Sequence, residues 1–172
     1  MRNRGFTLIE LIVVIAVIGI LAAIIAPNAF KAIEKGKIAA AESDYKALKT
    51  GAMSFYADTG QWPADGVVVA TSPNPFLAVP AGVTGWDGPY LEKFPARDPW
   101  GGAYTWNNDS SMDWTGDGTN DAARYVTLTN VSPTSAAKID VDLDGTAGAG
   151  AGTVIYTTAS GVCTVNVLVS RD

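Results

Sequence analysis

The stretch that decides the fold is Phe6–Ala26, FTLIELIVVIAVIGILAAIIA, near the start of a 172-residue chain. Eighteen of its 21 residues are apolar, and the exceptions are Thr7, Glu10 and Gly19. At about 1.5 Å per residue, a helix of this length spans about 31 Å, which matches the hydrocarbon core of a bilayer. We therefore predict a membrane-spanning helix rather than the buried helix of a soluble domain.

The remainder of the chain has an ordinary globular composition, with about 42% apolar residues. The whole chain has a formal net charge of −5, no histidine and one cysteine. The absence of histidine excludes Ser-His-Asp and Cys-His catalysis and two-histidine zinc helices. A single cysteine excludes an intrachain disulfide and a four-thiolate metal site. We predict no catalytic residue and no enzyme, and an acidic chain is not expected to bind nucleic acid.

The residues on either side of the apolar stretch predict its orientation. Arg2 and Arg4 precede it with no acid beside them, so the positive-inside rule places the N-terminus in the cytoplasm. A removable secretory signal would have a shorter apolar stretch and a small-x-small cleavage site. Here Pro27-Asn28-Ala29 follows and a helical pattern continues, so we do not expect the whole span to be removed.

Glu10 does not fit a passive membrane anchor. On insertion scales a charged side chain costs about 2.5–3.5 kcal/mol at the helix centre and less near the interface. The span contains no Lys or Arg, so no cationic partner is available within it. Glu10 is therefore a candidate functional residue, and the alternative is a side chain that reaches back to the headgroups.

The stretch Arg4-Gly5-Phe6-Thr7-Leu8-Ile9-Glu10 resembles the processing motif of type IV pilins and of type II secretion pseudopilins. The resemblance implies that a membrane prepilin peptidase cleaves between Gly5 and Phe6 and that Phe6 is then N-methylated. It also implies that the new Phe6 amine pairs with Glu10 of a neighbouring subunit, which favours docking and sets the axial register of a filament.

A second helical segment is predicted after the span. From residue 38 the apolar positions recur in steps of three and four: Ile38, Ala41, Tyr45, Leu48, Ala52 and Phe55. This face is predicted to pack on a globular domain, and Gly60 is expected to end the helix. The family resemblance implies that Gly19–Pro27 unwinds inside a filament, and the alternative is a simple kink at Pro27.

The head carries turns and strands. Gly88-Pro89-Tyr90-Leu91 and Asp98-Pro99-Trp100-Gly101 resemble two turns of the major pseudopilin head. Residues 102–106, 123–130, 153–158 and 162–170 have strand composition. Ser132-Pro133 is expected to begin a short helix, and Cys163 is expected to be a core residue because it shares the apolar face of the last strand.

The predicted fold class is α+β, with a long N-terminal helix packed on a small antiparallel sheet of about four strands. The expected domains are a leader at 1–5, a transmembrane and filament-core helix at 6–26, an amphipathic helix at 27–59 and a globular head at 60–172.

Two acidic stretches have oxygen-rich compositions of the kind found in calcium sites. Residues 113–121, DWTGDGTND, concentrate oxygen ligands around glycines, so we predict Ca²⁺ there, with a solvated acidic turn as the alternative. The expected ligands are Asp113, Asp117, Asn120 and Asp121. Residues 140–145 begin like an EF-hand, but Ala151 occupies the position of the bidentate Glu, so a helix end is predicted instead.

The resemblance implies a structural subunit of a type IV pilus-like filament. Before assembly the subunit would lie in the bacterial cytoplasmic membrane with its head in the periplasm, and the filament would then stand in the periplasm or at the cell surface. We favour a major pseudopilin-like subunit in type II protein secretion. The alternatives are a pilin of a surface type IV pilus, serving adhesion, motility or DNA uptake, and a membrane-anchored ligand-binding module. Expected partners are further copies of the chain, the prepilin peptidase, an inner-membrane assembly platform with its ATPase, and membrane lipid.

Overall fold

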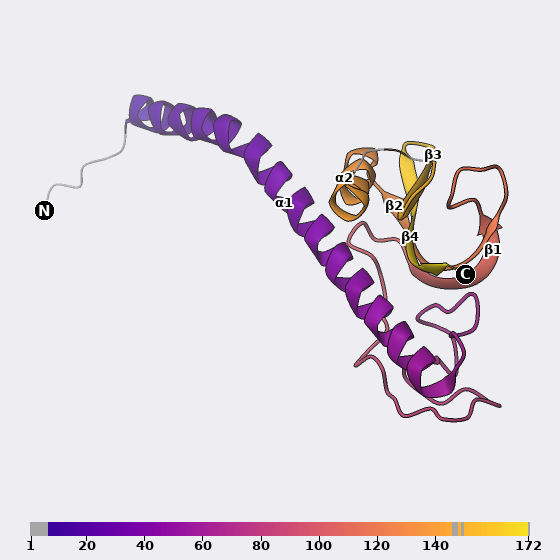
Figure 1. The fold of residues 1–172 in the computed structure, drawn as a ribbon. Coiled ribbons are helices and arrows are strands. Elements are labelled where there is room, and N and C mark those ends of the chain that lie inside the picture. Colours follow the sequence, from indigo (N-terminus) through magenta and orange to yellow (C-terminus); the bar gives the residue numbers. More distant parts are fainter. Residues whose placement is uncertain (1–6, 146–147, 149, 172) are drawn as a thin grey trace, which may run out of the picture. The chain divides into compact units, whose positions relative to one another are not determined.

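The computed structural model describes residues 7–145, 148 and 150–171. In chain order the elements are α1 (Leu8–Thr59), β1 (Tyr104–Met112), β2 (Asp121–Val131), α2 (Pro133–Asp144), β3 (Val154–Ala159) and β4 (Val162–Arg171) (Figure 1). The chain forms two compact units, Met1–Gly36 and Lys37–Asp172. Gly5 and Phe6, the predicted processing positions, lie outside the described residues.

The first unit contains the apolar part of α1. Each residue from Thr7 to Ile33 is exposed in the isolated chain. By length and composition alone, the helix can cross a membrane. It continues through Gly19 and Pro27, although Pro27 has no backbone N–H for the helical hydrogen-bond ladder. Unwinding of this stretch concerns the assembled filament and stays a prediction.

In the second unit, the remaining part of α1 buries one face. The buried residues include all six predicted positions, and Gly51 is buried with them. A Cβ at Gly51 would lie 3.2 Å from Leu91 Cδ2, so glycine allows the connection between α1 and β1 to approach the helix closely. The helix ends as predicted: Gly60 has φ +72° and donates its N–H to Tyr56 O at 2.8 Å.

The four strands form one antiparallel sheet in the order β1-β2-β4-β3. The sequence predicted all four strands, but β1 is longer than expected. Its polar second half pairs with the beginning of β2, as in the pair Asp109↔Ala123. Cross-strand pairing therefore extends this edge strand through residues that have little strand propensity of their own.

The core lies between the buried face of α1 and the sheet. Trp106 on β1 is fully buried, donates Nε1–H to Pro63 O at 3.3 Å and meets Phe76 edge-on at 5.7 Å between ring centroids. Cys163 on β4 is 1% exposed, which confirms that it is a core residue. These contacts confirm the α+β class and the helix-on-sheet architecture.

The ends of α2 follow the sequence closely. Ser132 Oγ accepts a hydrogen bond from Ser135 N at 3.3 Å, and Pro133 is the first helical residue. At the other end Gly145 has φ +80° and donates its N–H to Val141 O at 3.0 Å. Residues 140–145 are therefore a helix end, as predicted, rather than a calcium loop of the EF-hand type.

Asp98 connects the turn before β1 to the sheet. The side chain is 4% exposed, and its Oδ1 accepts hydrogen bonds from Trp100 N and Gly102 N, each at 2.9 Å. Oδ2 accepts Thr129 N at 3.1 Å. A Cβ at Gly102 would lie 2.4 Å from Thr129 O, so only glycine fits there. This turn holds the end of the connection between α1 and β1 in place.

Candidate functional site

The first candidate site is the beginning of α1, where Thr7 and Glu10 form a reciprocal pair. Glu10 Oε2 accepts hydrogen bonds from Thr7 N at 2.8 Å and from Thr7 Oγ1 at 2.6 Å. In return Glu10 N donates to Thr7 Oγ1 at 3.3 Å. This arrangement is a capping box, and it satisfies two backbone N–H groups that the first turn of a helix leaves without an intrahelical partner.

The capping box gives Glu10 an uncharged hydrogen-bond partner in its own helix, while the apolar span still contains no Lys or Arg to pair with its charge. The signal of the capping box was present in the sequence as Thr7-x-x-Glu10, the usual spacing of this motif. A carboxylate in the first turn also interacts favourably with the helix dipole. The two hydrogen bonds that Glu10 accepts from Thr7 both end on Oε2. Pairing of Glu10 with the amine of Phe6 stays a prediction, because Phe6 is not among the described residues.

The second candidate site is the loop between β1 and β2. Asp113 accepts N–H groups from Gly116 and Gly118, each at 2.7 Å. Asp121 Oδ2 accepts Trp114 N at 2.8 Å, and both carboxylates are within hydrogen-bond distance of Thr115 N, at 3.2 and 3.1 Å. The hydrogen bond from Gly118 is the largest cause that holds the pKa of the Asp113 carboxyl below its usual value; burial opposes it, and the hydrogen bond from Gly116 adds to the lowering.

The structure brings two of the four predicted Ca²⁺ ligands, Asp113 and Asp121, to the same place in this loop. Asp113 and Asp121 converge on the same backbone amide, whereas Asp117 is exposed and accepts Thr119 N at 2.8 Å. Across residues 7–145, 148 and 150–171, no group of three or more acidic or thiol side chains is arranged to hold a metal ion. The loop's own N–H groups occupy the carboxylates, and Ca²⁺ binding stays a prediction.

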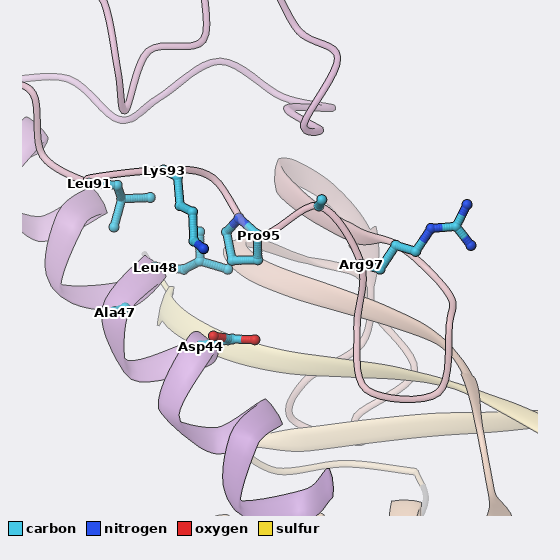
Figure 2. Close-up of a pocket in the computed structure, with 8 residues that line it drawn as sticks. Asp44, Ala47, Leu48, Leu91, Lys93, Pro95 and Arg97 are labelled. Atoms are coloured by element: carbon cyan, nitrogen blue, oxygen red, sulfur yellow. The ribbon is translucent and has the colours of Figure 1, made fainter.

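A third feature, which the sequence did not reveal, is a pocket of about 340 Å³ between residues 44–48 of α1 and residues 91–97. Leu48, Leu91 and Pro95 supply apolar walls. In Figure 2 the Lys93 side chain extends between Leu48 and Pro95, and Asp44 lies on the α1 side. We call this cavity the Lys93 pocket. Its two walls are more than forty residues apart, so no local sequence pattern predicts it.

The other charged groups of the Lys93 pocket have partners. Asp44 Oδ2 accepts the hydroxyl of Tyr104 at 2.9 Å, and burial, followed by the charge of Asp44, raises the pKa of Tyr104. Arg97 Nη1 donates to Gly101 O at 3.4 Å, and Figure 2 shows its side chain pointing away from Lys93. The cation inside the pocket is therefore Lys93.

Comparisons with known proteins give consistent matches. The family model described as "PilW, C-terminal" matches residues 32–122, and the "Prokaryotic N-terminal methylation motif" matches residues 1–26. "Type II secretion system core protein G" of Aeromonas hydrophila is 35% identical over 103 residues, covering 60% of this chain and 71% of that protein. The protein of the same name from Klebsiella pneumoniae is 35% identical over 104 residues, covering 60% and 73%.

A pilin also matches, over a shorter stretch. "Type IV major pilin protein PilA" of Myxococcus xanthus is 49% identical over 61 residues, covering 36% of this chain. The aligned region is 28% of that pilin's length. High identity is therefore confined to about a third of this chain, whereas the lower identity to the G proteins extends well into the head.

Proposed function

Because this chain belongs to the family of type IV pilins and type II secretion pseudopilins, we propose that it polymerises into the pseudopilus of a type II secretion system. We choose the secretion system because the alignment covers a larger share of the length of the secretion proteins than of the pilin. The Aeromonas G protein is matched over 71% of its length, and the Myxococcus pilin over 28%. A subunit of the surface type IV pilus is the second candidate, and the 49% identity to that pilin supports it.

The proposed mechanism is polymerisation driven by the apolar half of α1. Residues 8–33 are exposed in the isolated chain, and lipid covers them before assembly. In the filament the same residues pack against equivalent helices of other subunits. Glu10, which the capping box holds near the helix start, then meets the Phe6 amine of a neighbour. A charge that is costly in lipid becomes paired on assembly, which favours leaving the membrane for the filament.

The proposed partners follow from the N-terminal motif. A prepilin peptidase cleaves after Gly5, and Phe6 is methylated. Arg2 and Arg4 support an N-terminus in the cytoplasm, so the head would lie in the periplasm of a bacterium. An inner-membrane platform and its ATPase would then extract the subunit, since a helix of this length does not leave a bilayer unaided.

One experiment tests the family function. The full chain is produced in its native host, surface and periplasmic filaments are isolated, and the N-terminus of the subunit is determined by mass spectrometry. We expect methyl-Phe6 as the first residue. An intact Met1 in a protein that stays monomeric in the membrane would overturn the proposal and would favour the ligand-binding module.

A second measurement separates the two filament types. The gene is deleted, and both protein secretion and surface filaments are quantified. Loss of secretion with intact surface pili supports the pseudopilus. Loss of surface pili with normal secretion would contradict it and would assign the chain to a surface pilus.

A further inference from the structure

The Lys93 pocket has the chemistry of a site for a single carboxylate. Among the residues that the structure describes, no hydrogen bond or ion pair to the Lys93 ammonium is found. Glu92 is its neighbour in sequence but does not line the pocket. The apolar side chains of Leu48 and Pro95 lie beside the Lys93 side chain, and the carboxylate of Asp44, which accepts the Tyr104 hydroxyl, lines the α1 side of the same pocket. Because Lys93 and Arg97 outnumber Asp44 among the lining residues, the pocket has a net positive charge that favours a ligand with one negative charge on a narrow segment.

A segment of this same chain has that shape and charge. At the tip of the loop between β1 and β2, Asp117 stands between Gly116 and Gly118, and all three residues are exposed. The flanking glycines have φ +76° and +88°, a backbone conformation that suits glycine and adds no side chain beside the carboxylate. Residues 113–121 contain three Asp and no Lys or Arg.

The tip is also held in one conformation before it meets a partner. Asp113 accepts the N–H of Gly116 and the N–H of Gly118, each at 2.7 Å, so its carboxylate fixes the backbone on both sides of Asp117. A loop that is already ordered loses less conformational entropy when it binds. The Asp117 carboxylate is thus presented on a thin, ordered projection.

The pocket and the tip are different surfaces of the chain, and this determines the kind of assembly that they can build. A contact between two unlike surfaces is heterologous, and it repeats from subunit to subunit without closing unless the rotation forms a ring. Repetition of that kind produces a helical filament. Opposite charges on the two surfaces also favour the correct register over contacts between like surfaces.

We propose that the Lys93 pocket of one subunit binds the Asp117 carboxylate of a second copy of this chain. The ammonium of Lys93 pairs with the carboxylate, and the slim Gly116-Asp117-Gly118 tip enters between the apolar walls. This inference rests on the proposed filament function, and it adds a head-to-head contact that is separate from the packing of the apolar helices. The contact would give the heads a fixed order around the filament.

Cysteine cross-linking in the full chain tests the contact directly. Lys93→Cys and Asp117→Cys are combined, with Cys163→Ala to remove the buried native thiol. We expect oxidation to give a ladder of dimers and higher multimers on non-reducing gels. The single variants and the pair Lys93→Cys with Ala159→Cys, an exposed hairpin position, are matched controls that should give no ladder.

Charge exchange provides an independent readout. Lys93→Glu places a carboxylate against Asp117, and Asp117→Lys places two ammonium groups together, so each is expected to lower filament yield about tenfold. The combined variant restores the opposite pair and should recover most of the yield. A failure of the combined variant to recover, together with no ladder from the cysteine pair, would overturn the contact.

Experiments on wild-type filaments distinguish a failure of the head contact from a failure of the filament function. If wild-type filaments form and the paired cysteines give no more cross-linking than the controls, the head contact is wrong and the filament function stands. If wild-type chains with processed Phe6 form no filament in the host, the proposed function fails and the contact falls with it.

Discussion

The hydroxyl of Tyr45 on α1 donates a 2.5 Å hydrogen bond to the backbone carbonyl of Leu168 on β4. The two residues are 123 positions apart in the chain. Tyr45 is 5% exposed, and Leu168 at the other end of the bond is partly buried. The bond connects the second half of α1 to β4, a central strand of the sheet. It is thus one of the contacts that define the head.

Removing this hydroxyl is expected to destabilise the head. In Tyr45→Phe the partly buried Leu168 carbonyl loses the hydroxyl donor, and the loss of a hydrogen bond costs about 0.5–1.5 kcal/mol, more where the acceptor is left without a partner. We expect the free energy of unfolding to fall by about 1–2 kcal/mol, measured by urea unfolding of the full chain in detergent with tryptophan fluorescence. Tyr56→Phe is the matched control, because Tyr56 is 45% exposed and should change stability little.

The raised pKa of Tyr45 predicts that the free energy of unfolding changes with pH in the alkaline range. Burial raises the pKa of Tyr45 from 10.0 to about 12. Because the folded pKa is above the unfolded value, the stabilisation from the neutral phenol is complete below about pH 10. It is lost as the pH rises through about 12. The difference in stability between wild type and Tyr45→Phe should therefore shrink from pH 9 to pH 12, and a constant difference would contradict this assignment.

Asp98 is expected to be the most sensitive polar residue of the head. Asp98→Ala removes the acceptor of three backbone N–H groups, those of Trp100, Gly102 and Thr129, at a position that is 4% exposed. We expect a loss of about 3 kcal/mol or more in the free energy of unfolding.

The conservative variant separates hydrogen bonding from packing in that experiment. Asp98→Asn keeps the shape and one acceptor oxygen, so it should retain part of the stability that Asp98→Ala loses. Equal losses in the two variants would mean that the negative charge, rather than the number of accepted bonds, stabilises the turn.

Features were predictable from the sequence where apolar residues repeat at the spacing of a helix or a strand. The buried face of α1 repeats in steps of three and four residues because the helix has 3.6 residues per turn. Likewise, the alternation around Cys163 on β4 identified its core side. The N-terminal motif indicated the family for a similar reason, since its residues are consecutive and each type is needed at its position.

Features that depend on distant partners were not predictable in this way. The polar half of β1 is a strand because β2 pairs with it, as in Asn107↔Tyr125, and its composition alone indicates a loop. The Lys93 pocket exists because residues 91–97 lie against residues 44–48. The capping box is different, because the spacing Thr7-x-x-Glu10 indicates it locally, although it supplies no cation for the Glu10 carboxylate.

The loop between β1 and β2 is expected to weaken in acid. Hydrogen bonds from its own backbone hold the pKa of Asp113 below the usual 3.8. A lowered folded pKa contributes stability that is present above about pH 4 and is lost as the pH falls through the folded pKa. The melting temperature of wild type should therefore exceed that of Asp113→Asn at pH 6, and the gap should narrow towards pH 2.5. Asp87→Asn, at an exposed position, is the control.

The Ca²⁺ prediction for Asp113, Asp117, Asn120 and Asp121 assigns the Asp117 carboxylate to the ion, so it is an alternative to the contact with Lys93, and it is tested with wild type and Asp113→Asn. Melting is repeated with added calcium and with a chelator at pH 7. A rise in midpoint with calcium that is lost in Asp113→Asn supports a site in the loop. Equal midpoints with calcium and with chelator contradict it.

Thr7 is expected to hold the first turn of α1 together with Glu10. Thr7→Val keeps the size and branching of the side chain but removes the Oγ1 that both donates to Glu10 Oε2 and accepts Glu10 N. Loss of an N-cap side chain costs about 1 kcal/mol, which corresponds to about a fivefold change in an equilibrium constant. We expect the Glu10 amide to exchange its hydrogen about five times faster in micelles, while Thr7→Ser should exchange like wild type. Unchanged exchange in Thr7→Val would show that the capping box does not form in a membrane environment, and Glu10 would then depend on a neighbouring subunit for its hydrogen bonds.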